Sequence, residues 1–123
     1  MSHLLPAVSG ALLVGSVLLA PMSVGAADID AGRDVFATTC ATCHGPNGSP
    51  DPDSPVVQGL GVVPADLSDP LFNSREPTGD WEMVVKHGGD AMGLAAQMPP
   101  HKDALSDEQV ENVIGYVKSM VDT

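Results

Sequence analysis

The chain has 123 residues and carries 16 acidic against five basic side chains, which gives a formal net charge of −11. This balance makes nucleic acid and anionic membrane surfaces poor partners for it. It favours a partner with an electropositive docking face, although the same charge also promotes solubility.

The first 27 residues contain no Lys, Arg, Asp or Glu, and an apolar run within them ends at Pro21. Small residues follow at the spacing of a cleavage site, so residues 1–27 are predicted to be a secretory signal peptide cut after Ala26 or Ala27. An uncleaved membrane anchor is the alternative, because the uncharged stretch exceeds the roughly 20 residues that span a bilayer. Prolines and glycines interrupt the stretch and favour cleavage. Either way, residues 28–123 are expected to form one domain that is periplasmic or otherwise extracytoplasmic.

A short amphipathic helix is predicted from residue 30 to residue 40, opening at Asp28 or Asp30. Residues 46–77 hold seven prolines and several glycines, a composition that predicts almost no regular structure. Residues 56–63 are apolar enough to be buried within that loop. A loop of this length in a compact domain needs a surface to pack against.

Two helices are predicted in the last third of the chain. Thr78 is expected to cap the first over residues 80–86, with Gly88 at its C-terminal turn. Trp81 and the following valines would share its inner face. The second is expected over residues 107–120, where Ser106 and Gln109 have the spacing of a capping box. No strand pattern competes, so the predicted fold class is all-α.

The two cysteines, Cys40 and Cys43, belong to the sequence Cys-Ala-Thr-Cys-His that ends at His44. Cys-x-x-Cys-His is the motif by which haem c is attached covalently. Two thiols at a helix end reach the two porphyrin vinyl groups, and the adjacent imidazole then lies under the iron as its axial ligand. We therefore expect Cys40 and Cys43 to bind one haem and His44 to bind its iron. A haem face would also supply the surface that residues 56–63 need.

Three other uses compete for these cysteines. A thioredoxin-like dithiol requires a βαβ context, which the sequence lacks. A zinc site would need ligands such as His87 and His101. A plain disulfide would close so short a loop that it constrains the unfolded chain little.

The second axial ligand must come from later in the chain, where five side chains qualify. Met98 is favoured because Met98-Pro99-Pro100 holds a thioether on an extended stretch just before the last helix. Met92 is the runner-up, and His101 would give two imidazole ligands. The candidates are Met83, Met92, Met98, His87 and His101.

These features together resemble a class I cytochrome c, the small monohaem kind of bacterial periplasms and of related oxidase and dehydrogenase subunits. The resemblance spans residues 30–121 and rests on Gly32 and Phe36 before the attachment motif, the Met98-Pro99 pair, and Leu105 to Glu108 with Tyr116. It implies a cytochrome c fold of three to four short helices around one covalent haem. It also implies that the first and last helices cross closely, with Gly32 allowing the approach and aromatic residues packing beside it.

The resemblance further implies that a backbone carbonyl from the loop after the motif orients His44, with Pro55 or Pro64 as candidates. Arg75 and Trp81 are candidate donors to a haem propionate. Basic members of the family dock through a ring of lysines, which this acidic chain does not have, so its partner should differ.

The expected function is to carry single electrons between periplasmic or membrane-bound redox partners through a His44/Met98-ligated iron, without enzymatic activity. An enzyme or gas sensor is the alternative if Met98 leaves the iron open. A fixed subunit of a membrane complex is the alternative if the leader is retained.

Overall fold

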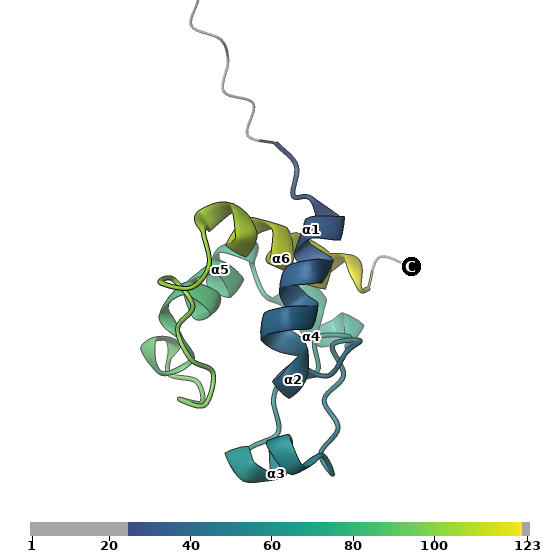
Figure 1. The fold of residues 1–123 in the computed structure, drawn as a ribbon, viewed down its shortest axis with the longest axis vertical. Coiled ribbons are helices and arrows are strands. Elements are labelled where there is room, and N and C mark those ends of the chain that lie inside the picture. The colour runs from purple at the N-terminus through teal and green to yellow at the C-terminus, as the bar shows by residue number, and fades with distance from the viewer. Residues whose placement is uncertain (1–24, 122–123) are drawn as a thin grey trace, which may run out of the picture.

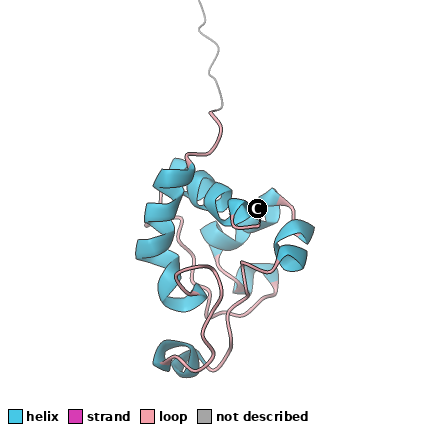
Figure 2. Cartoon of the chain, turned by 90° about the vertical axis from the view of Figure 1, so that its right-hand side faces the viewer, coloured by secondary structure: helices cyan, strands magenta, loops and turns pink. Residues whose placement is uncertain are grey.

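The computed structural model describes residues 25–121, which contain helices, turns and loops but no strand (Figures 1 and 2). The predicted leader lies outside the described residues except for its last three positions. None of the helices within residues 25–121 is long and apolar enough to cross a membrane. The elements are α1 (Ile29–Val35), the π-helical turn η1 (Phe36–Cys40), α2 (Ala41–His44), α3 (Pro55–Leu60), α4 (Pro70–Arg75), α5 (Thr78–His87), the 3₁₀ turn η2 (Asp90–Met92) and α6 (Asp107–Ser119).

The first helix begins where an aspartate was expected to cap it. The Asp28 carboxylate accepts a hydrogen bond of 3.0 Å from the backbone N–H of Ala31. The helix then continues through a π-helical turn directly before the second half of the attachment motif, where the N–H of Ala41 donates to the carbonyl of Phe36. The Thr38 hydroxyl donates to the carbonyl of Asp34 at 3.0 Å, which competes with the regular backbone bonds of this turn.

The last helix confirms its predicted capping box. The Ser106 hydroxyl accepts from the N–H of Gln109 at 3.1 Å, and the Gln109 side chain accepts from the N–H of Ser106 at 3.0 Å. Both orphan donors at the helix start are thereby satisfied. The helix ends at Ser119, one residue before the predicted end.

The proline-rich segment 46–77 contains two short helices, α3 and α4, where almost no regular structure was expected. Each has a proline at its first position, Pro55 or Pro70, where the missing N–H costs nothing. Ser54 and Asp69 cap these helices through their side chains. The prediction missed these two helices because proline is favoured in the first turn of a helix but breaks a helix in its interior.

Thr78 does not cap α5, contrary to the prediction. Pro77 occupies the cap position, and Thr78 is already the first helical residue without a side-chain capping bond. The predicted end of the helix is confirmed, since Gly88 follows it with φ of +83°, a value that favours glycine.

Helices α1 and α6 cross at close range, as Figure 1 shows. A Cβ atom on Gly32 would lie 2.0 Å from the carbonyl oxygen of Asn112, so only glycine permits this approach. The rings of Phe36 and Tyr116 pack edge to face beside the crossing, with centroids 5.5 Å apart. The predicted crossing and its glycine and aromatic roles are therefore confirmed.

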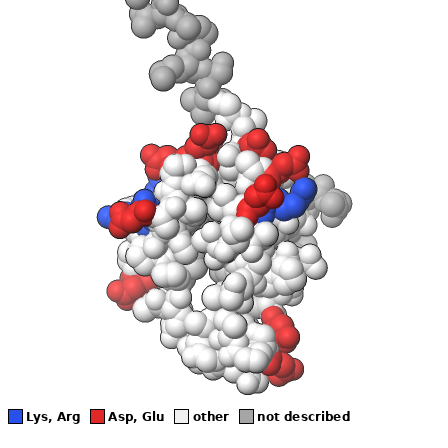
Figure 3. Space-filling view, in the orientation of Figure 1, with Lys and Arg blue, Asp and Glu red and all other residues white. Residues whose placement is uncertain are grey.

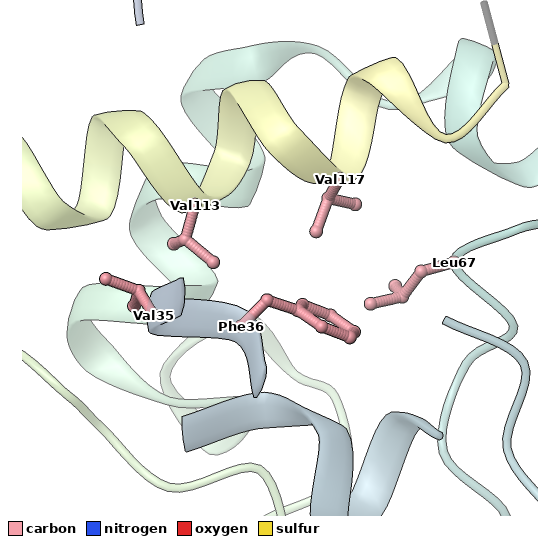
Figure 4. Packing of buried hydrophobic residues seen from close by; sticks show 5 residues of the cluster. All are labelled: Val35, Phe36, Leu67, Val113 and Val117. Atoms are coloured by element: carbon pink, nitrogen blue, oxygen red, sulfur yellow. The ribbon is translucent and has the colours of Figure 1, made fainter. Parts of the chain in front are cut away.

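The hydrophobic core is small and lies under this crossing. Figure 4 shows Phe36 facing Val113 and Val117 of α6, with Val35 and Leu67 beside it. These five side chains are all buried. A core of this size leaves much of the interior to be completed by something other than side chains.

Candidate functional site

A cavity of about 520 Å³ lies below the core. Its walls come from the continuous segment η1–α2, from helices α5 and α6, and from the loops that precede and follow α5, and the lining side chains are mainly apolar. The predicted inner face of α5 is confirmed, since it faces this space. The large apolar side chains that η1, α5 and α6 contribute to it are Phe36, Trp81, Val84, Val85, Val113, Ile114 and Val117.

The attachment motif lies at the wall of the same cavity. Cys40, Cys43 and His44 all line it, and neither thiol forms a disulfide. Burial, with a smaller contribution from the neighbouring Cys43, raises the pKa of the Cys40 thiol to about 11. The Cys40 sulfur is therefore a neutral thiol at neutral pH.

The loop after the motif orients the His44 ring. Its Nδ1 lies 3.1 Å from the carbonyl oxygen of Ala65, and because a carbonyl only accepts, Nδ1 carries the proton. Burial lowers the pKa of His44, and the bond to Ala65 opposes this effect. The imidazole is thus held neutral, with the lone pair of Nε2 free to bind a metal.

The residue that supplies this carbonyl is neither of the two predicted, Pro55 or Pro64. The loop is anchored two residues after Ala65, where the N–H of Leu67 donates to the carbonyl of Gly48 at 2.8 Å. That anchor brings the Ala65 carbonyl to the ring. Which residue's carbonyl reaches the His44 ring depends on this backbone contact between two loops. The sequence pattern does not show that contact.

The five candidates for a second axial ligand separate into two groups. Met92, Met98 and His101 line the cavity together with the attachment motif. Met83 is 45% exposed, and neither it nor His87 lines the cavity.

The segment that carries Met98 packs against two consecutive glycines after α5. The N–H of Gly89 donates to the carbonyl of Met98 at 2.9 Å, and a Cβ atom on Gly89 would lie 2.2 Å from the carbonyl of Ala95. The N–H of Met98 donates to the carbonyl of Ala95 at 3.2 Å. The role of Gly89 was missed, although the Gly88-Gly89 pair is a sign of close backbone approach.

Trp81 places a polar group on this otherwise apolar wall. Its indole Nε1 is buried and has no hydrogen-bond partner among the described residues. A buried donor without a partner is costly unless a ligand supplies the acceptor. Of the two candidate donors to a haem propionate, Trp81 lines the cavity and Arg75 is exposed and does not.

Of the apolar residues 56–63 only Val57 is buried, so the prediction that this stretch is buried is wrong for most of it. Val57 is buried at 3% exposure, as predicted for the whole stretch. Val56 is 42% exposed and Val63 is 54% exposed. Val62 and Val63 line the cavity, where a planar apolar ligand would cover them.

The donor set suits a haem: two thiols, a neutral imidazole, thioethers, an apolar wall and an unpartnered N–H. Helical fold and site together define a small class I c-type cytochrome, whose cofactor is covalently bound haem c.

Comparison with known proteins places the chain within this class. A family model described as "Cytochrome C oxidase, cbb3-type, subunit III" matches residues 27–117, and the chain belongs to this family of c-type cytochrome domains.

Two curated relatives are similar to the chain. Cytochrome c6 of Gracilaria tenuistipitata var. liui is 34% identical over 92 residues, which cover 75% of this chain and 72% of that protein. The cbb3-type cytochrome c oxidase subunit FixP of Sinorhizobium medicae (strain WSM419) is 30% identical over 95 residues, or 75% of this chain. The chain spans only 30% of the length of FixP.

A solved structure shares the fold. The c-type cytochrome KustC0563 superposes with a TM-score of 0.59 at 22% identity, covering 73% of this chain and 96% of that one. The predicted all-α cytochrome c fold is confirmed, although residues 25–121 contain six α-helices and not the three to four expected.

Proposed function

We propose that this cytochrome carries single electrons outside the cytoplasm, with its haem attached through Cys40 and Cys43 and its iron ligated by His44 and Met98. The observation that carries the proposal is that all four side chains line one apolar cavity of about 520 Å³. Bound there, haem supplies an iron that accepts and releases one electron.

The protein's own residues prepare the proximal side. Ala65 keeps the His44 proton on Nδ1, so that Nε2 presents its lone pair without any rearrangement. The two thiols lie on adjacent turns of the same helical segment, at the end of η1 and within α2. Thioether bonds from them would not dissociate, which suits a carrier that must keep its cofactor in an open compartment.

A structural reason favours Met98 over Met92. Its backbone is bonded at both N–H and carbonyl, and the side chain is half-buried. Met92 lies on the short turn η2 and is 37% exposed. A thioether held on a fixed backbone keeps the same ligand in both redox states, so little reorganisation accompanies electron transfer. Methionine also raises the reduction potential relative to a second histidine.

The remaining predictions concern where the protein acts and with what. We infer that residues 1–27 direct export and that residues 28–123 form the cytochrome domain. The net charge of −11 suits a redox partner whose docking face is electropositive.

Absorption spectra of the exported protein test the assignment of the site. The wild type should give a reduced c-type spectrum and, when oxidised, the weak near-infrared band of thioether ligation. Cys40→Ser should leave at most one thioether bond, seen by mass spectrometry after denaturation. A wild type without covalent haem would overturn the proposal.

Methionine variants then identify the distal ligand. Met98→Ala should abolish the near-infrared band and lower the potential, because an open or weakly ligated site loses the thioether. Met83→Ala is the matched control, since Met83 lies outside the cavity, and it should keep the band. Loss of the band in Met92→Ala but not in Met98→Ala would assign the iron to Met92. A wild-type protein whose spectrum is low-spin but lacks the near-infrared band would show that His101, which also lines the cavity, is the second axial ligand.

A further inference from the structure

Lys118, in the last turn of α6, lies on the side of Trp81 that does not face the cavity. Its Nζ is 4.6 Å from the centroid of the Trp81 ring. Trp81 lines the haem cavity and Lys118 does not. The indole ring therefore separates this ammonium group from the haem site.

Two backbone carbonyls at the end of α4 hold the ammonium in place. Nζ donates to the carbonyl oxygens of Asn73 at 2.5 Å and of Glu76 at 2.7 Å. Carbonyls at a helix C-terminus lack partners within the helix and carry partial negative charge, so a cation is stabilised there. Lys118 consequently ties α6 to the α4–α5 connection beside Trp81.

The charge of Lys118 is not cancelled by a directly bonded carboxylate. Within residues 25–121 the ion pairs are those of Arg33 with Asp30 and of Lys86 with Glu82 and Asp107. Burial lowers the pKa of Lys118, and the charge of Glu76 opposes this effect. Because no carboxylate of the described residues forms an ion pair with Nζ, the charge of Lys118 is only partly offset, by the more distant carboxylate of Glu76.

We propose that Lys118 is a positioning residue for the haem site, which holds Trp81 in the cavity wall and raises the reduction potential of the iron. The inference rests on the proposed electron-carrier function. Oxidation of ferrous to ferric iron gives one electron to the redox partner and adds one positive charge to the site. A fixed cation nearby disfavours that added charge, so the ferrous state is stabilised and the potential rises.

The experiment compares midpoint potentials of the haem-loaded full chain. Lys118→Met should lower the potential, and Lys118→Arg, which keeps the charge, should restore most of the difference. Arg33→Met is the matched control, because it removes the same net charge and a cation 5.7 Å from the ring of Tyr116, which does not line the cavity. Its potential should stay close to that of the wild type.

A second measurement reports on Trp81 itself. It is the single tryptophan of the chain, so the reduced protein has one indole N–H signal in a proton–nitrogen NMR spectrum. That signal should move toward the position of a solvated indole in Lys118→Met and remain in place in Lys118→Arg. If Lys118→Met fails to load haem, Lys118→Gln serves instead, because its amide can still donate to one carbonyl without the charge.

Two results would overturn the inference. One is a folded Lys118→Met or Lys118→Gln variant that is less stable than the wild type but has an unchanged reduction potential. Lys118 would then only connect α6 to the α4–α5 connection. The other is an equal drop in Arg33→Met, which would show an effect of net charge. Neither result touches the proposed electron-carrier function, which fails if the wild type carries no covalent haem.

Discussion

At the scale of single residues, the best example of a role hidden in the sequence is Asn73. Its side chain is fully buried, at 0% exposure. Its amide donates to the carbonyl of Leu67 and to that of Val117, each at 2.9 Å. One side chain thus joins the loop beside the cavity to the last helix, and nothing in its sequence context distinguishes it from a surface asparagine of a proline-rich segment.

We expect Asn73→Ala to lower the free energy of unfolding by about 1–3 kcal/mol, because the buried carbonyl of Leu67 loses the Asn73 amide as its donor and that of Val117 keeps only the N–H of Met120. Denaturant unfolding of the haem-loaded protein measures it. Asn47→Ala is the control, since Asn47 is exposed, and it should change stability by less than about 0.5 kcal/mol. Equal stabilities of the two variants would show that the buried amide contributes nothing net.

At the scale of elements, the crossing of α1 and α6 determines the geometry of the site. It positions Phe36 against α6 and, through the continuous segment α1–η1–α2, the attachment motif at the cavity wall. Gly115 tightens the same region, because a Cβ atom there would lie 2.5 Å from that of Ala27. The crossing is therefore a contact between backbones, with little room for side chains.

Gly32→Ala should destabilise the protein by about 1–3 kcal/mol, because the added methyl group would overlap the Asn112 carbonyl and force the helices apart. Gly59→Ala in α3 is the matched control. No atom lies within 4 Å of a Cβ built there, and alanine should stabilise a helix by about 0.5–1 kcal/mol relative to glycine. Thermal unfolding of both variants decides the matter, and a neutral Gly32→Ala would contradict the close crossing.

At the scale of the whole molecule, charge is distributed unevenly. On the face shown in Figure 3, acidic side chains gather mainly over the upper part, and a largely uncharged surface extends below them. With a net charge of −11, the protein's long-range electrostatic field attracts cations, while the largely uncharged surface in Figure 3 is available for apolar contact.

Electron exchange with small redox reagents should reveal this field. The bimolecular rate constant for reduction by a cationic reagent such as hexaammineruthenium(II) should fall as salt is raised, because the screening length shrinks from about 30 Å at ~0.01 M to about 8 Å at ~0.15 M. With an anionic reagent such as ferrocyanide it should rise. Stopped-flow absorbance measures both, and identical salt dependence for the two reagents would contradict a negative field at the site of exchange.

Much of the fold followed from local sequence signals. The capping box of α6 and the cap at Asp28 each join residues three apart, so their interactions are encoded within one helical turn. The haem cofactor followed from five consecutive residues. By contrast, α3 and α4 were missed because proline has opposite effects at the first turn and in the interior of a helix.

What the sequence determined by itself was the class of protein: a motif of adjacent residues for covalent haem, amphipathic helices with their own caps, and a strongly acidic composition. Only the tertiary structure decided that Ala65 orients His44, that Trp81 and not Arg75 faces the cavity, and that Lys118 lies behind that ring. These contacts join residues far apart in the chain, and they depend on which loop and helix ends meet. Local conformational propensity carries no information about such long-range contacts, because the packing of the whole chain around one cavity determines them.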